Sequence, residues 1–504
     1  MDFLDYYRDN LTYLRGLAAE FAVEFPKIAD RLSLSEFECQ DPYVERLLEG
    51  TAFLAARVEK KLDDGYSGFL ESVLNSSAPS ALYPIPSGAV AELELDLKNP
   101  ELSKGSAVLP AGTIFDAFIP TINTPCRFTS VEDVPLAPFN MEVEYLTRNV
   151  ASLEIDGSKA DAALHIKLTS ITGDELPLFN EYLFYINLPD AAASLILRQL
   201  IIDRESVYLK AGEGRFQQAD EVDIYPVIPT GASSLMGELK GNAVGLKLLK
   251  DYLTHPAFYK FFALKGAASA AAKCKSIEFA VTLKVRENSL ASLKTGDIKL
   301  NCVPIINLFP KRSDRVFIDR EAFEFHIVPQ RTAVRDYEVL VVKKLEFFNE
   351  RNENIFTASN FYEEDILSGP HVRNFFSQHR RERLFPEKGE KRSSYAGSEM
   401  YISFSSREAD LGSAHQFTAE LLCTNRDLPL LILPNTPLLS SSPFTSRAAF
   451  ISTPTRPAYP LVNRGGRGDF AHLGHIHFNL SALLWREGNF PAEGLKELIK
   501  SYGV

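Results

Sequence analysis

The first part of the chain, residues 1–80, carries apolar side chains at alternating intervals of three and four positions. This spacing keeps the side chains on one face of a helix and is typical of helices that pack along a seam. Pro26 cannot continue a helix, so the pattern predicts a helix that ends just before it. The members of this first seam are Leu4, Tyr7, Leu11, Leu14, Ala18, Phe21 and Phe25.

A second seam follows, flanked by residues that helix ends prefer. Asp41 is a good N-cap, Pro42 suits the first helical position, and Gly65 can take the left-handed conformation that ends a helix. The pattern therefore predicts a helix that starts at Pro42 and ends near Gly65. Thr51 and Ala55 make part of its seam thin, so that another helix can come close. The members of the second seam are Val44, Leu48, Thr51, Ala55, Val58 and Leu62, with Leu47 and Leu54 beside them.

Helices of this length are marginal in water and need packing partners. The two seams either satisfy each other within the chain or join a larger bundle that includes another chain. The spacing alone leaves both interpretations open.

Beyond residue 80 the pattern changes, and every second residue is apolar over short runs such as 91–97, 164–168 and 277–285. This alternation is typical of strands with one buried face. It favours antiparallel sheets with one solvated face over a doubly wound parallel sheet. The predicted fold class is therefore α+β, with an N-terminal helical bundle segment followed by mainly antiparallel β domains.

Along the sequence, the chain divides into four segments. A helix is expected within residues 245–263, up to the boundary that Pro256 sets. Residues 380–394 carry charges of both signs and few apolar side chains, which predicts a flexible, solvated loop. The segments are a helical core-bundle segment at 1–80, a β-rich domain at 81–270, a second β-rich domain at 271–430, and an α+β segment at 431–504.

Composition narrows the class of protein. With 504 residues, 45% of them hydrophobic, the chain has ample material for globular cores. Its net charge of −12 argues against a nucleic-acid partner. The acidic N-terminus does not resemble a signal peptide, and no apolar run is long enough to cross a bilayer. Five scattered cysteines form no disulfide framework and fit a reducing cytoplasm.

The carboxylates of the second predicted helix raise the question of catalysis. Glu45 and Glu49 lie four residues apart and share one helix face. A di-metal site in a bundle would need Glu-x-x-His pairs, but no histidine precedes His165. Arg46 can pair with Glu49 at a spacing of three. These charges are therefore predicted to form a solvated or interfacial surface.

Three histidines near the C-terminus, His472, His475 and His477, are the best candidates for metal ligands. A metal-dependent hydrolase built on them is the alternative function. Apart from Asp469, no acidic residue or cysteine completes a ligand set at an obvious spacing. No phosphate-binding loop or nucleophile motif occurs either, so the motifs nominate no catalytic, cofactor-binding or metal residue.

Longer stretches carry a family resemblance. In the helical segment, EFAVEFPKIADRLSL is followed by DPYVERLLEGTAFLAARVEKKLDD. LYPIPSGAV and GLKLLKDYLTHPAFYKFF come later, and ELLCTNRDLP, Glu420–Pro429, is the most specific of the later motifs. Together they resemble the TssF (ImpG/VasA) family of type VI secretion system baseplate wedge subunits. A weaker likeness to phage tail baseplate wedge proteins lies in residues 108–138, where a turn at Pro110–Gly112 precedes a strand.

The resemblance implies a structural role, with no cofactor and no direct membrane insertion. Such proteins pair as two copies with one TssG and join TssE and TssK in a wedge around the VgrG hub, which primes assembly of the contractile sheath. They work in the cytoplasm, docked at the inner membrane through the secretion complex.

For this chain the resemblance places the partner-binding surface on the N-terminal helices. The seams would bury apolar surface against TssG and a second copy, while nearby charges would set the register. The implied residues are Leu4, Tyr7, Leu11, Leu14, Phe21, Phe25, Val44, Glu45, Arg46, Leu48, Glu49, Thr51, Ala55, Arg57, Val58 and Leu62.

Overall fold

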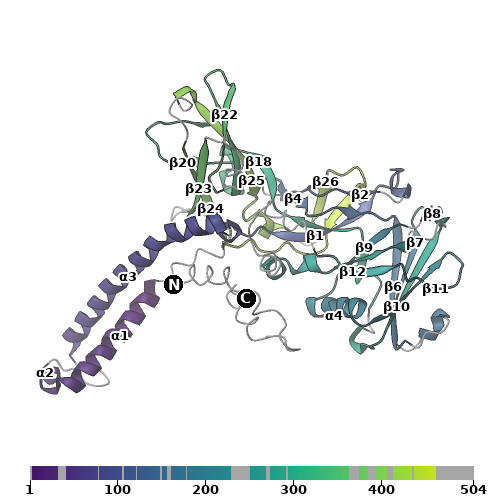
Figure 1. Ribbon diagram of the computed structural model, residues 1–504, viewed down its shortest axis with the longest axis horizontal. Coiled ribbons are helices and arrows are strands. Elements are labelled where there is room, and N and C mark those ends of the chain that lie inside the picture. The colour runs from purple at the N-terminus through teal and green to yellow at the C-terminus, as the bar shows by residue number, and fades with distance from the viewer. Residues whose placement is uncertain are drawn as a thin grey trace. The chain divides into compact units, whose positions relative to one another are not determined.

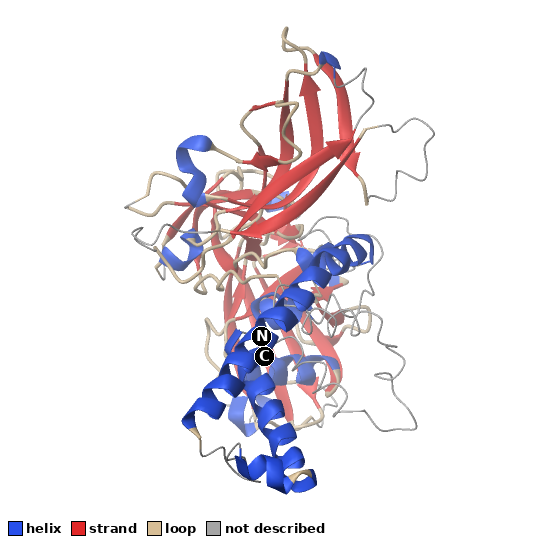
Figure 2. Cartoon of the chain, turned by 90° about the vertical axis from the view of Figure 1, so that its left-hand side faces the viewer, coloured by secondary structure: helices blue, strands red, loops and turns tan. Residues whose placement is uncertain are grey.

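The computed structural model of the chain separates into two compact units, one that includes residues 1–83 and one built from residues between 84 and 458. It describes residues 3–31, 41–77, 79–104, 107–120, 122–147, 150–155, 160–177, 179–228, 250–267, 273–290, 293–362, 374–383, 392–405, 412–433 and 436–460. Strands, red in Figure 2, make up most of the second unit.

The first unit is helical, as its heptad-like spacing predicts. Its helices are α1 (Phe3–Glu24), α2 (Pro26–Arg31) and α3 (Pro42–Ser77), followed by the 3-10 turn η1 (Pro79–Leu82). Helices α1 and α3 lie side by side as a hairpin (Figure 1). Pro26 ends α1 and opens α2, where its missing N–H costs nothing.

Helix α3 begins as predicted and ends later than predicted. The Asp41 carboxylate accepts a hydrogen bond from the Tyr43 N–H at 2.8 Å, which is the expected N-cap. The predicted end near Gly65 is wrong, because the helix continues to Ser77. A glycine inside a helix costs only about 1 kcal/mol, and packing of the fully buried Leu74 in the next turns outweighs that cost.

Replacing Asp41 with alanine is expected to destabilise the start of α3 by about 1 kcal/mol, because the Tyr43 N–H loses its acceptor. Faster hydrogen exchange at the amide of Tyr43 measures the effect. Asp41→Asn is the matched control, since it keeps a capping oxygen and should exchange nearly as slowly as the parent. Equal protection in the alanine variant would contradict the assigned cap.

The second unit contains a closed barrel of six short strands. Their order is β1 (Gly88–Leu95), β17 (Cys302–Ile306), β4 (Cys126–Ser130), β3 (Ile114–Ala117), β26 (Pro437–Ser440) and β27 (Thr445–Phe450). Strands from both ends of the unit close it, and Leu93 lies opposite Ala448. The turn before β3 is the predicted one, with Gly112 at a φ of 80°. Phe115 and Phe128 fill the barrel core.

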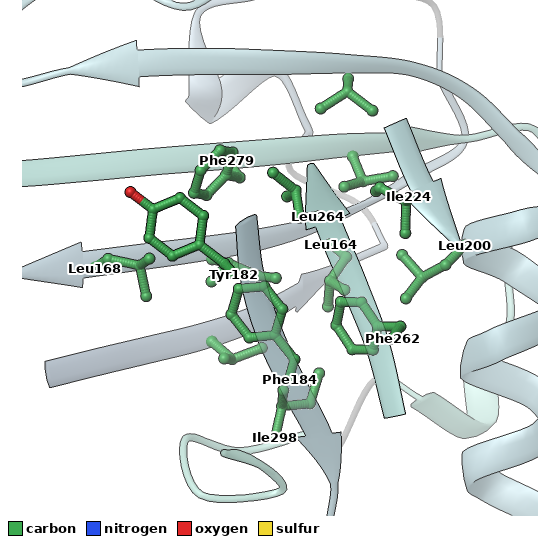
Figure 3. Packing of buried hydrophobic residues seen from close by; sticks show 14 of the residues in the cluster. Leu164, Leu168, Tyr182, Phe184, Leu200, Ile224, Phe262, Leu264, Phe279 and Ile298 are labelled. Carbon is green, nitrogen blue, oxygen red and sulfur yellow. The ribbon is translucent and has the colours of Figure 1, made fainter. Parts of the chain in front are cut away.

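Two further sheets share one apolar core with helix α4 (Asp190–Ile201). Figure 3 shows Tyr182, Phe184, Phe262 and Phe279 meeting between their strands. The first sheet has the order β11 (Gln217–Gln218), β10 (Arg204–Ala211), β15 (Ser276–Leu283), β7 (Ala162–Ser170) and β6 (Phe139–Leu146). The second has the order β12 (Asp223–Pro226), β13 (Phe261–Lys265), β9 (Glu181–Ile186) and β16 (Ile298–Leu300).

The fourth assembly is an eight-stranded sheet with its own apolar cluster, which includes Phe347, Phe376 and Phe417. Its order is β18 (Phe309–Arg312), β25 (Gln416–Thr424), β21 (Glu338–Phe348), β22 (Asn354–Asn360), β23 (Phe375–Glu382), β24 (Ser398–Ser405) and β20 (Phe325–Ile327), with β19 (Val316–Phe317) also paired to β25. Two short pairs complete the described strands, β2 (Val108–Leu109) with β5 (Val134–Pro135), and β8 (Leu176–Pro177) with β14 (Lys273–Cys274).

The predicted fold class is confirmed as α+β with mainly antiparallel sheets. Among the described pairs only β22 and β23 run parallel. The alternating runs form β1, β7 and β15, and their apolar positions face inward: Leu164, Ile166, Leu168, Ile277 and Phe279 are all buried. The division into four consecutive segments stays a prediction.

One local prediction agrees with the structure and another needs correction. Within the described part of 245–263, residues 250–254 are helical and the helix ends before Pro256, as predicted; a 3-10 turn, η4 (Pro256–Tyr259), and strand β13 follow. In the predicted loop, Arg380 lies in strand β23 and Arg392 forms ion pairs with two buried or half-buried aspartates. Composition misled here because charged side chains can be satisfied by partners far away in sequence. Residues 384–391 lie outside the described residues.

Two stretches of the family resemblance meet in the second unit. His255 of GLKLLKDYLTHPAFYKFF is buried, and its Nε2–H donates to the carbonyl of Pro86 in LYPIPSGAV at 2.9 Å. Its ring stacks on Phe258 with centroids 5.1 Å apart. A Cβ at Gly88 would lie 2.7 Å from Cζ of Phe258 and closer still to His255, so this contact requires glycine.

Candidate partner-binding helices

Polar pairs hold the α1–α3 hairpin together. The Tyr6 hydroxyl donates to Asp63 at 2.8 Å, and the Asn10 amide donates to Glu59 at 2.7 Å. Both donors and both acceptors are spaced by four residues, so they lie one turn apart on facing helix sides. The spacing of these polar residues is visible in the sequence and could have indicated the hairpin, but the prediction rested only on the apolar seams.

The closest packing of α3 uses alanines next to the predicted ones. Ala52 and Ala56 are fully buried, whereas Ala55 is half-buried and Thr51 is exposed. The Thr51 hydroxyl donates to the carbonyl of Leu47 in its own helix at 2.8 Å. The predicted thin part is therefore shifted by one residue. A straight helix has 3.6 residues per turn, so its buried face drifts away from a strict heptad spacing.

Part of the first seam is buried in the α1–α3 hairpin and part of it is exposed. Tyr7, Leu11, Leu14, Ala18 and Phe21 are half-buried in the hairpin. At the seam's two ends, Leu4 is 53% and Phe25 44% exposed. Helix α1 thus directs most of its predicted seam toward its own chain.

Half of the second seam lies outside the hairpin. Val44 and Leu48 are half-buried, but Val58 and Leu62 are 60% and 61% exposed. They continue into a row of exposed apolar side chains on one face of α3. This row, the α3 stripe, consists of Tyr43, Leu47, Leu54, Val58, Leu62 and Phe69. Within the described part of the chain, the first seam leaves Thr51, Val58 and Leu62 of the second seam exposed.

The charged residues of the candidate set lie at the surface. Glu45 accepts a hydrogen bond from Arg15, which raises the pKa of that guanidinium. Arg46 pairs with Glu49 at 2.7 Å, as predicted, and Arg57 is exposed. Exposed pairs of this kind contribute at most about 1 kcal/mol to stability.

The described residues offer no metal centre. They contain no group of three or more histidine, cysteine, aspartate or glutamate side chains that could hold a metal ion. His472, His475 and His477, the basis of the alternative hydrolase, lie outside the described residues. None of the helices in the described ranges is both long and apolar enough to cross a membrane.

Comparison with known proteins decides the family. A family profile described as "Type VI secretion system, TssF" matches residues 1–504. The chain belongs to the TssF family. This TssF sequence is also 29% identical to the type VI secretion system component TssF1 of Pseudomonas aeruginosa, over 99% of this chain and 83% of that protein.

A solved structure has the same fold as this TssF chain. It is a chain of a type VI secretion system TssK-TssF-TssG baseplate subcomplex, determined by cryo-electron microscopy. The match covers 91% of this chain and 81% of that one, with a TM-score of 0.67 and 20% sequence identity. Family and fold agree with the sequence-based resemblance, and neither supports the hydrolase alternative.

Proposed function

We propose that this TssF chain is a structural subunit of a type VI secretion system baseplate wedge, and not an enzyme. It assembles with TssG and TssK, and further with TssE around the VgrG hub, to initiate assembly of the contractile sheath. Its place is the cytoplasmic side of the inner membrane, where the secretion complex docks it. The family membership and the composition of the solved TssK-TssF-TssG subcomplex, one chain of which has the same fold, support this proposal.

The α3 stripe carries the proposal at the level of residues. Leu47, Leu54 and Val58 are 70%, 62% and 60% exposed in the single chain, which is costly unless a partner covers them. We propose that TssG and a second copy of this chain bury the stripe in a shared helical bundle. Burial at about 25 cal/mol per Å² supplies the affinity.

The charged residues then determine which partner and register fit. Glu45, Arg46, Glu49 and Arg57 flank the stripe at or near the surface of the hairpin. Charges at the rim of an interface contribute more to specificity and association rate than to raw affinity. In this proposal they exclude wrong registers of the bundle.

Co-expression tests the proposal. The full chain, produced together with TssG and TssK, is expected to purify through a tag on TssG and to elute with both proteins in one size-exclusion peak. A well-folded chain that elutes alone, while TssG and TssK are both soluble, would contradict it.

A further inference from the structure

The eight-stranded sheet is an insertion into the barrel. The chain leaves the barrel after β17 at Ile306 and enters the sheet at Phe309. It returns after β25 at Thr424, and Leu428 is already part of the barrel core. The apolar clusters of barrel and sheet share no member among the described residues. Buried polar residues lie where the two meet, beside the apolar Leu308 and Phe309. They include Asn425–Asp427 of the motif ELLCTNRDLP, to which the proposed function gives no role.

Two segments, the crossings, connect the barrel and the eight-stranded sheet, and a buried asparagine lies in each. Asn307 lies in the crossing that leaves the barrel and Asn425 in the one that returns to it, and both are fully buried. The Asn307 amide nitrogen donates to Asn425 Oδ1 at 2.9 Å, and the Asn425 N–H donates to Asn307 Oδ1 at 2.7 Å. Asn425 Oδ1 also accepts from the N–H of Arg127 in barrel strand β4 at 2.7 Å. The crossings are thus bonded to each other and to the barrel.

An ion-pair cluster lies beside these two asparagines. Asp427 is 1% exposed at its side chain and accepts from Arg392 at 2.6 Å, from Ser393 at 2.8 Å and from Arg426 at 3.0 Å. Burial alone would raise the pKa of Asp427, but the hydrogen bonds from Arg392 and Ser393 and the charge of Arg426 lower it overall.

The cluster extends to the barrel through a second aspartate. Arg392 Nη1 donates to Asp336 at 2.7 Å, on the sheet side of the crossings. Asp336 also accepts from the hydroxyl of Thr124 at 2.6 Å, in the connection between barrel strands β3 and β4. Two arginines therefore oppose two aspartates, and each aspartate has at least two donors.

The backbone at the centre is constrained as well. Arg426 has a φ of 53°, in the left-handed region that few non-glycine residues occupy. Its guanidinium donates to the carbonyl of Ala396 at 3.1 Å. Opposite it, a Cβ at Gly397 would lie 3.0 Å from Cγ and Cδ of Arg426. Such a conformation persists only where the surroundings over-determine it.

We propose that these residues form a polar joint, a built-in conformational device that holds the eight-stranded sheet at one orientation on the barrel. Apolar contacts are non-directional and allow sliding, whereas hydrogen bonds and ion pairs are satisfied in one geometry only. Any other orientation would leave buried charges and amides without partners. The polar joint consists of Asn307, Arg392, Asp336, Asn425, Arg426 and Asp427. The inference does not depend on the proposed function.

Spin labels on the full chain measure the orientation. Thr357 in β22 and Arg447 in barrel strand β27 are exposed and can be changed to cysteine for labelling. Cys39 is replaced by serine, and the other native cysteines, Cys126, Cys274, Cys302 and Cys423, are buried. The label-to-label distance in the parent chain is expected to have a single, narrow distribution. A broad or bimodal distribution in the parent would overturn the proposal.

Substitutions then test the residues of the joint. Asp427→Asn removes the buried charge and should broaden the distribution about twofold or more, as a second orientation becomes populated. Arg392→Gln is the milder variant, because that side chain is 25% exposed, and it should broaden the distribution in the same direction. It decides the test if Asp427→Asn fails to fold.

Glu278→Gln is the matched control. It neutralises a carboxylate that also has two partners, Lys210 and His165, but lies in a different sheet. It should leave the distance distribution unchanged. A folded Arg392→Gln chain with the parental distribution would overturn the polar joint, as would equal broadening in the Glu278→Gln control.

Discussion

Changing both Leu54 and Val58 to aspartate is expected to abolish co-purification with TssG. Both side chains lie on the α3 stripe, and burying unpaired carboxylates in an apolar interface costs several kcal/mol. Since they are 62% and 60% exposed in the single chain, its free energy of unfolding should fall by about 1 kcal/mol or less. Pull-down with tagged TssG and thermal unfolding of the variant measure both effects.

A matched control separates the stripe from added charge alone. Arg8→Asp with Thr12→Asp places two aspartates at the same spacing on exposed, polar positions of α1. This chain should still co-purify. Leu48 is a less informative site, because it is half-buried in the hairpin and an aspartate there would disturb the single chain as well. Normal recovery of a folded Leu54 and Val58 double variant would show that the stripe is not the binding surface.

Acid is expected to destabilise the second unit through His255. Burial lowers the pKa of this imidazole to about 4, against 6.5 in an unfolded chain. As the pH falls below 6.5, the imidazole is protonated in the unfolded state but stays neutral in the folded state. The free energy of unfolding therefore decreases until about pH 4, where the folded state is protonated as well. The loss amounts to roughly 3 kcal/mol in all and about 2 kcal/mol between pH 7 and pH 5. Denaturant unfolding at these pH values measures it.

His255→Gln is the comparison that isolates this imidazole. A glutamine amide can still donate toward the carbonyl of Pro86 but does not titrate. The variant should be less stable at pH 7 and should lose less stability than the parent toward pH 5. Carboxylates such as Asp427 titrate in both chains and cancel in the difference. An identical pH dependence of the two chains would rule out the histidine as the cause.

The helical segment was largely predictable because its information is local. The cap at Asp41 and the break at Pro26 depend on neighbours within a few residues, and both are found. The end of α3 and the register of its buried face were wrong. The register depends on packing against α1, which buries Ala52 and Ala56 and not the heptad positions beside them. The later end depends on the burial of Leu74 beyond Gly65.

In the β-rich unit, the individual strands could be predicted but their pairing could not. Alternation identified strands β1, β7 and β15 and the side that each buries. It could not reveal the barrel, because Leu93 finds its partner at Ala448, and a period of two says nothing about which strands pair. The ion pairs of Arg392 could not be predicted for the same reason, because its partners Asp336 and Asp427 are distant in sequence.

The exposure of the α3 stripe was predicted in part, while its binding to a partner stays a prediction. The seam pattern identified Val58 and Leu62, and these remain exposed when the hairpin forms. It could not separate them from Leu11 and Leu14, which α1 keeps half-buried against its own chain. The distinction required the position of α1 on α3, which Tyr6 and Asn10 fix through Asp63 and Glu59.

Native mass spectrometry of the complex purified after co-expression with TssG measures the stoichiometry of the proposed bundle. The proposed bundle predicts a mass that corresponds to two copies of this chain and one TssG, and loss of that species when Leu54 and Val58 are aspartate. A folded chain that is recovered only as a free monomer beside soluble TssG would contradict the proposed bundle.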